Sequence, residues 1–157
     1  MEQRRRNPGL DALEPLVGEW AAVASKGGQR MGSMTMTCEW GEGRAFLVQR
    51  AYGEPDESTP PEWAAASPLP TVTITGLDDT SGELHTLYAD ARGVCRVYRT
   101  SVADGVWRMW RDAPGFFQQY IGAFGPDGDT VTGAWESSPD GTDWEYDFDL
   151  TYTRVRA

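Results

Sequence analysis

Short turn motifs divide most of this chain into segments of strand length, and this spacing constrains the fold more than any other feature. Gly and Asp recur in the connectors, which are Gly27-Gly28, Gly41-Glu42-Gly43, residues 78–82, Asp104-Gly105, and residues 112–115, 125–128 and 138–141. These residues readily adopt the positive φ angles that tight β-hairpins require. Consecutive strands are therefore expected to pair as antiparallel neighbours in a meander.

The segments between the turns have the residue pattern of β-strands. Helical spacing is confined to Leu10, Leu13, Leu16 and Val17, where Pro15 limits any helix to a short turn. Strands are expected at Val17–Ser25, Met31–Trp40, Ala45–Tyr52, Thr71–Thr75, Glu83–Ala89, Val94–Val102, Val106–Arg111, Phe116–Phe124, Thr130–Glu136 and Trp144–Val155. Such regularly spaced short strands are typical of a barrel or sandwich. We predict an all-β fold: an antiparallel up-and-down β-barrel of about ten strands with a short N-terminal helical turn.

The length of 157 residues suits one domain with its own core. Residues 1–9 are expected to form a flexible tail, and residues 10–157 a single barrel domain. Within it, the connector 53–70 is acidic, rich in Pro and too long for an ordinary hairpin loop. It is either disordered or a lid, and residues 61–66 could form one helical turn with Trp63 as an apolar anchor.

Composition argues against several classes of partner. A net charge of −10 opposes binding to nucleic acid or to an anionic membrane. No apolar run approaches the roughly 20 residues of a membrane-spanning helix, and no apolar core of a signal peptide follows the basic N-terminus. We expect a cytoplasmic protein whose partner is a small hydrophobic molecule. The oligomeric state stays open, a homodimer included.

Metal and cofactor motifs are absent from the sequence. Cys38 and Cys95 form no CxxC pair and have no neighbouring His, so we expect two buried, reduced thiols. His85 is the only histidine, which excludes a multi-His metal site within one chain. A structural role is expected for His85, with a single general base or a haem ligand as the alternatives. The prediction is no metal and no cofactor.

Alternation identifies the side chains that face the barrel interior. In the last strand, Tyr146, Phe148, Leu150 and Tyr152 alternate with polar residues and are predicted to face inward. Pairing the hairpins backwards from there opposes Trp135 to Trp144, Gly133 to Tyr146, Met109 to Gln118 and Val102 to Trp107, with Tyr120 over Gly133. A bulge at Gly141 suits the turn equally well, but it would bury Glu136 against Trp144.

The resulting inward face mixes large aromatics with Arg, Gln and phenols, which is typical of a small-molecule pocket. Its predicted ligand-binding residues are Arg96, Tyr98, Trp107, Met109, Gln118, Tyr120, Trp135 and Tyr146. Arg96 and Arg111 could instead reach water from strand ends. The alternating acids Glu136, Asp143, Glu145 and Asp147 are expected to form a solvated outer rim.

The segment Leu16-Val17-Gly18-Glu19-Trp20 resembles the Gly-x-Trp start of calycin barrels, which include lipocalins, fatty-acid-binding proteins and nitrobindins. Residues 88–94, 110–116 and 135–144 resemble an uncharacterised calycin-like bacterial family. In lipocalins the strand Trp packs across the closed end of the barrel beneath an Arg, and the resemblance gives these roles to Trp20 and Arg154. The chain departs from nitrobindins in lacking both the Gly-x-Trp-x-Gly-x-Gly motif and a C-terminal His to bind haem.

Three functional hypotheses follow. The first is an intracellular binding barrel for a small apolar or aromatic molecule whose polar or anionic end meets Arg96 and Tyr98. The second is a cofactor-free isomerase or cyclase for a hydrophobic, polyketide-like substrate, with Tyr98, Gln118 or Tyr120 polarising a carbonyl. The third is a filled barrel that acts through its surface.

Overall fold

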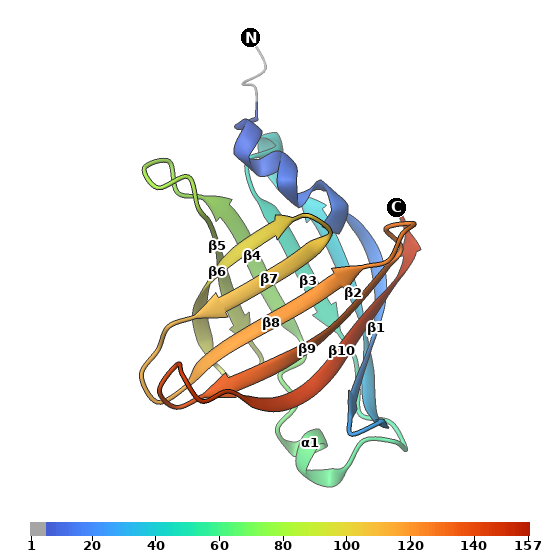
Figure 1. The fold of residues 1–157 in the computed structure, drawn as a ribbon. Coiled ribbons are helices and arrows are strands. Elements are labelled where there is room, and N and C mark those ends of the chain that lie inside the picture. Colours follow the sequence, from blue (N-terminus) through green and yellow to red (C-terminus); the bar gives the residue numbers. More distant parts are fainter. Residues whose placement is uncertain (1–5) are drawn as a thin grey trace.

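The computed structural model describes residues 6–157 as a closed barrel of antiparallel strands (Figure 1). The strands are β1 (Gly18–Lys26), β2 (Gln29–Trp40), β3 (Leu47–Tyr52), β4 (Thr71–Leu77), β5 (Leu84–Asp90), β6 (Cys95–Ala103), β7 (Val106–Arg111), β8 (Phe117–Phe124), β9 (Thr130–Ser138) and β10 (Glu145–Arg156). Each strand pairs with the next in the chain, and β10 closes the barrel against β1. The prediction of an all-β up-and-down barrel of about ten strands is confirmed.

The turn between β6 and β7 shows how local chemistry builds this meander. Asp104 and Gly105 have φ angles of 53° and 73°, the left-handed conformation that a two-residue hairpin turn requires. The strands beside it pair Ala103 with Val106 and Val102 with Trp107, as expected from the sequence.

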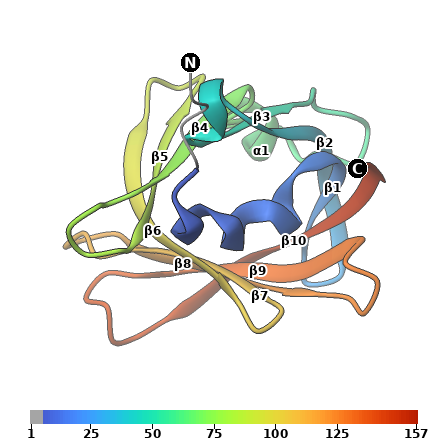
Figure 2. The same cartoon turned by 90° about the horizontal axis from the view of Figure 1, so that it is seen from above.

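A 3-10 helix, η1 (Pro8–Leu16), covers one end of the barrel (Figures 1 and 2). Its leucines at 10, 13 and 16 are buried. The Asn7 side chain accepts a hydrogen bond from the Gly9 N–H at 2.9 Å, and the Arg6 guanidinium lies 4.3 Å from the centre of the Trp40 ring. Residues 6–9, which were expected in a flexible tail, therefore belong to this cap, while residues 1–5 lie outside the described part of the chain.

Trp20 and Arg154 join the cap to the barrel. Trp20 is 1% exposed, and its indole N–H donates to the Leu16 carbonyl at 2.9 Å. The Arg154 guanidinium lies 4.1 Å from the centre of the Trp20 ring, so the contact expected from the resemblance to lipocalins is confirmed. The same guanidinium donates to the carbonyls of Pro15 and Gly128 at 2.9 and 3.2 Å.

Gly18 shows why glycine precedes this tryptophan in the motif. Its φ angle is +137°, and a Cβ at this position would lie 2.5 Å from the Arg156 carbonyl oxygen. The close approach of β10 therefore leaves no room for a side chain at position 18.

The long connector covers the opposite end of the barrel (Figure 1). It contains the expected helical turn, α1 (Pro61–Ala65), and Trp63 packs edge-on against Phe148 at 5.2 Å between ring centres. Arg30 on β2 donates to Asp56 and Ser58 at 2.9 and 2.8 Å. Movement of this connector as a lid stays a prediction. Within residues 6–157, no helix is long and apolar enough to cross a membrane.

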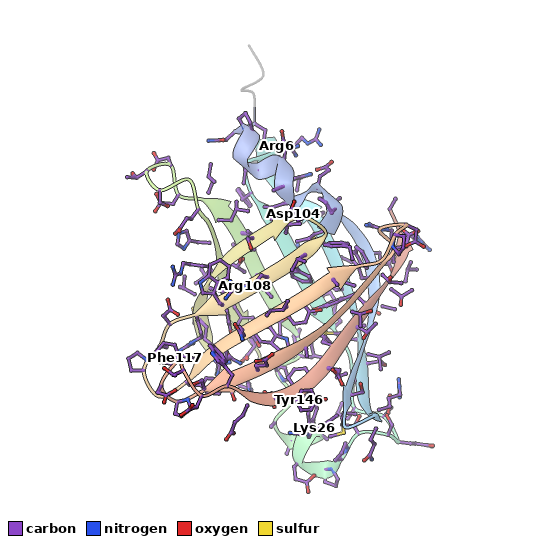
Figure 3. The ribbon with its side chains drawn as sticks, viewed as in Figure 1. Arg6, Lys26, Asp104, Arg108, Phe117 and Tyr146 are labelled. Carbon is purple, nitrogen blue, oxygen red and sulfur yellow. The ribbon has the colours of Figure 1, made fainter. Side chains whose placement is uncertain are left out.

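Three predicted registers are wrong. Met109 pairs with Tyr120 instead of Gln118, and Tyr120 pairs with Trp135 instead of Gly133. Both are slips of two residues, which leave the side chains of β7, β8 and β9 on their expected faces. Between β9 and β10, Trp135 pairs with Phe148 instead of Trp144, and the register shifts between Tyr146 and Phe148. That irregularity ends the alternation at Tyr146, which lies on the outside of the barrel with 48% of its surface exposed (Figure 3).

Candidate ligand-binding site

The barrel encloses a cavity of about 510 Å³ between the long connector and the middle of the barrel. An aromatic cluster separates this cavity from the capped end. Trp107 is 2% exposed and lies 5.4 Å from Tyr152, whose ring meets Trp20 at 6.5 Å between centres. Because this aromatic cluster closes the cavity at the capped end, a ligand would enter from the end covered by the long connector.

Opposite walls of the cavity differ in chemistry. β1, β2 and β10 supply an apolar wall of Ala22, Ala24, Met34, Met36, Phe148 and Leu150. We call the facing side the polar wall, and it consists of Gln49, Thr73, Thr86, Tyr88, Arg96, Tyr98 and Gln118 from β3 to β6 and β8. Trp107, Met109 and Trp135 line the cavity from β7 and β9.

Arg96, Tyr98 and Gln118 form one cluster in the polar wall. The Tyr98 hydroxyl donates to Gln118 Oε1 at 2.6 Å, and Arg96 Nη1 lies 3.4 Å from the same oxygen. Burial raises the pKa of Tyr98, although Arg96 and Arg111 act in the opposite direction, so the phenol is neutral. Within residues 6–157, no carboxylate lies within ion-pair distance of Arg96, whose guanidinium is 5.1 Å from the centre of the Phe116 ring.

A second arginine at the cavity is neutralised within the protein. Arg92 donates to the Asp90 carboxylate at 2.7 Å, and Tyr88 donates to the same oxygen at 2.7 Å. Burial alone would raise the pKa of Asp90, but hydrogen bonds from Arg92, Tyr88 and backbone N–H groups outweigh it and lower the pKa to about 2. Asp90 is therefore ionised at neutral pH, which leaves Arg96 as the arginine without a counter-ion at this wall.

The structure brings most of the predicted residues together. Arg96, Tyr98, Trp107, Met109, Gln118 and Trp135 line the cavity. Tyr120 lies behind the lining with 0% exposure, and its hydroxyl donates to the Leu150 carbonyl at 3.0 Å. Tyr146 lies outside, where its hydroxyl donates to Asp149 at 2.8 Å. Ligand binding by the six lining residues stays a prediction.

The positions of two other charged residues can be compared with the expectations from the sequence. Asp147, expected on the solvated rim with Glu136, Asp143 and Glu145, reaches the cavity mouth, where its carboxylate lies 3.9 Å from Lys26 Nζ. Arg111 is half-buried, and its Nε is buried without a hydrogen-bond partner among the described residues. Arg111 is the last residue of β7, in agreement with the strand-end alternative, although its Nε is shielded from water.

Sequence reasoning missed the polar residues of β3 to β5. Gln49, Thr73 and Thr86 line the cavity, but the pairing argument ran backwards from the last strand and stopped at β6. The signal was present, because polar Thr73 and Thr75 alternate with apolar Val72 and Ile74 on β4. The connector residues at the mouth, such as Trp63 and Leu69, carry no periodic pattern from which their contacts could be inferred.

The comparisons with known proteins support the fold. The chain is similar to Rv2717c from M. tuberculosis, whose crystal structure superposes with a TM-score of 0.58 over 97% of this chain and 100% of that chain, at 17% sequence identity. No protein-family model matches the chain, and the search of curated proteins found no match. At this identity the similarity shows a shared fold and carries no information about the ligand.

His85 lies away from the cavity. It is on β5, one residue out of phase with Thr86, and its Nε2 is 3.9 Å from a Glu83 oxygen. No cluster of three or more His, Cys, Asp and Glu side chains within residues 6–157 could hold a metal ion.

The two cysteines have different environments, contrary to the expectation of two buried thiols. Cys38 is buried, and burial raises its thiol pKa to about 12, partly offset by a hydrogen bond with Gln49. Cys95 is exposed on the outer face of β6.

One thiol should therefore react in the native protein. Because the thiolate is the reactive form, a disulfide reagent at pH 8 should modify Cys95 and leave Cys38 untouched. The measurement is a native titration of Cys95→Ser and Cys38→Ser alongside the parent, repeated in denaturant. Rapid modification of the Cys95→Ser variant under native conditions would contradict the burial of Cys38.

Proposed function

We propose that this protein is a calycin-like binding barrel for a small apolar or aromatic molecule that carries a polar or anionic end. The observation that carries the proposal is the cavity of about 510 Å³ inside the barrel. Its volume lies within the range of small-molecule sites, and its lining combines apolar side chains with a few polar groups, as such sites do.

The charges at the cavity support an anionic or strongly polar group near Arg96. Arg92 is already paired with Asp90, whereas Arg96 meets the Phe116 ring and makes a long contact with Gln118 but has no carboxylate partner among the described residues. Glu54 and Glu62 on the connector are exposed and solvated, so they oppose an anion at the wall less than a buried acid would. A ligand anion would give the Arg96 guanidinium the charge-assisted partner that it lacks.

The arrangement of the phenols favours binding over catalysis. The Tyr98 and Tyr120 protons, two of the predicted means of polarising a carbonyl, are donated to Gln118 and to the Leu150 carbonyl. Burial raises the pKa of both phenols, which makes neither a base near neutral pH. A cyclase or isomerase would have to break these hydrogen bonds before either group could assist a substrate.

Replacing Arg96 by alanine should weaken binding of an anionic ligand by about 1.5–3 kcal/mol, the value of a hydrogen bond to a charged group. The test is a tryptophan fluorescence titration with dodecanoic acid and with dodecanol. The variant should lose its preference for the acid and keep its affinity for the alcohol.

Arg108→Ala is the matched control, because Arg108 lies on the outer face of β7 and donates only a long bond to Gln119 (Figure 3). It should bind both ligands as the parent does. If the parent protein bound dodecanoic acid and dodecanol with equal affinity, the pocket would not select an anionic group, and that part of the proposal would be wrong. Failure of both ligands, and of planar ring compounds such as flavone, would overturn the binding function itself.

A further inference from the structure

The hydrogen-bonding groups of the cavity follow its length instead of gathering at one end. Leu84 of β5 is buried in the core that includes the η1 leucines, and the turn after β5 carries Arg92 at the other end. Between them, Thr86 pairs with Tyr98 and Tyr88 pairs with Arg96 across β5 and β6. The polar wall therefore offers side chains at successive levels from the depth of the barrel to its mouth.

The hydroxyl protons of this wall are committed to neighbouring protein atoms, whereas Arg96 and the Gln118 amide nitrogen keep protons that they can donate to a ligand. Thr73 Oγ1 donates to Gln49 Oε1 at 2.8 Å, Tyr98 donates to Gln118 at 2.6 Å, and Tyr88 donates to Asp90 at 2.7 Å. The Thr86 hydroxyl lies 2.7 and 2.6 Å from the hydroxyls of Thr75 and Thr100.

Each hydroxyl has one proton and two lone pairs. Once the proton of Thr73, Tyr88 or Tyr98 is donated to the protein, the remaining capacity of that group is to accept. Thr86 has one proton and two lone pairs for two hydroxyl neighbours, so one of these three remains for a ligand hydroxyl. The hydroxyls of Thr73, Tyr88 and Tyr98 are therefore acceptors that lie beside the donors Arg96 and Gln118. A ligand complements this wall with hydroxyl groups along one edge, which donate to these oxygens and accept from the two donors.

The apolar wall determines the chemistry of the opposite edge of the ligand. Ala22, Met36 and Leu150 face the polar wall and offer no hydrogen-bonding side chain. A ligand that fits both walls is polar along one edge and apolar on the other. A linear acid meets Arg96 with its carboxylate but leaves the deeper acceptors facing its methylene groups.

We propose that the ligand class is a polycyclic aromatic compound with several hydroxyl groups along one edge, as in a polyhydroxylated flavone. The inference rests on the proposed binding function and specifies its ligand. It predicts that the donors on the ligand, as well as its size and its anionic end, determine affinity.

Calorimetric titration with three planar compounds tests this. The probes are apigenin, which carries phenolic hydroxyls, its fully O-methylated ether, which cannot donate, and unsubstituted flavone, which is smaller than both. Apigenin should bind about tenfold more tightly than either, the upper end for one neutral hydrogen bond. Because flavone is the smallest probe, its weak binding cannot be a steric effect.

Substitutions in the polar wall test which residues are responsible for the preference for apigenin. Tyr98→Phe and Thr86→Val should each lower the affinity for apigenin by about three- to tenfold and leave that for flavone unchanged. Thr35→Val is the control, because Thr35 is exposed on β2 and should change neither affinity. Thermal melts of each variant establish that the fold is intact, and Tyr98→Phe carries the test if Thr86→Val does not fold.

The outcomes separate this inference from the function on which it rests. Equal affinities for apigenin, its ether and flavone, or a dodecanoic acid complex that none of the ring compounds can match, would overturn the hydroxylated ligand class and leave a binding barrel. Absence of binding by the ring compounds, the acid and the alcohol would overturn both.

Discussion

Replacing Trp20 by alanine should lower the free energy of unfolding by about 3–5 kcal/mol, the range for removing a large aromatic side chain from a core. The indole is 1% exposed and contacts three separate parts of the fold. It donates to the Leu16 carbonyl at the end of η1, lies beneath Arg154, and meets the edge of Tyr152. Chemical denaturation followed by circular dichroism measures the loss.

Trp110→Ala is the matched control, because Trp110 is only partly buried and lies against Arg99 and Arg108 at 5.4 and 4.6 Å. This variant should lose only about 1–2 kcal/mol of unfolding free energy, since each of its two arginine contacts contributes about 0.5–1 kcal/mol at an exposed site. Similar losses for the two variants would show that Trp20 does not hold the cap to the barrel.

Gly133→Ala should destabilise the barrel by about 3 kcal/mol, the upper end of the range for adding a methyl group to a packed core. A Cβ on Gly133 would lie 2.6 Å from both the Tyr120 ring and the Ile121 carbonyl oxygen. The ring is held by the bond from its hydroxyl to the Leu150 carbonyl, and the carbonyl is part of the β8 backbone, so neither can simply move aside.

Gly76→Ala provides the comparison, because Gly76 is also within a strand but has no neighbouring atom within 4 Å of the position that a Cβ would occupy. Alanine there should be neutral or slightly stabilising, since it restricts the unfolded chain. Denaturation of both variants, with near-ultraviolet circular dichroism of the buried aromatics, measures the difference. Equal stability of the two would mean that Tyr120 does not depend on the glycine.

The prediction of inward-facing residues was correct for β6 to β9, although not for Tyr146 on β10, because alternation survives some register errors. A slip of two residues between β7 and β8 moved Met109 from Gln118 to Tyr120 without changing the face of either strand. A second slip of two residues pairs Tyr120 with Trp135 instead of Gly133, although the Tyr120 ring still lies over the glycine. Face is fixed by parity alone, whereas register also depends on the exact shape of each turn.

The register shift in β10 could not be inferred in the same way. The sequence from Tyr146 to Tyr152 alternates without interruption, so the shift between Tyr146 and Phe148 leaves no mark in the pattern. Tyrosine suits both a core and a surface, which hides its change of face. The position of the connector could not be predicted from alternation either, because the contact between Trp63 and Phe148 depends on tertiary packing.

The pairing of β1 with β10 also affects how the chain acquires its structure during synthesis. β1 emerges from the ribosome early, whereas β10 follows all the other strands in the chain. Until β10 has emerged, β1 and β9 each keep an open edge that can pair with a second chain. The nascent protein therefore depends on its last strand for protection against aggregation, and delayed release of β10 should favour association between unfinished chains.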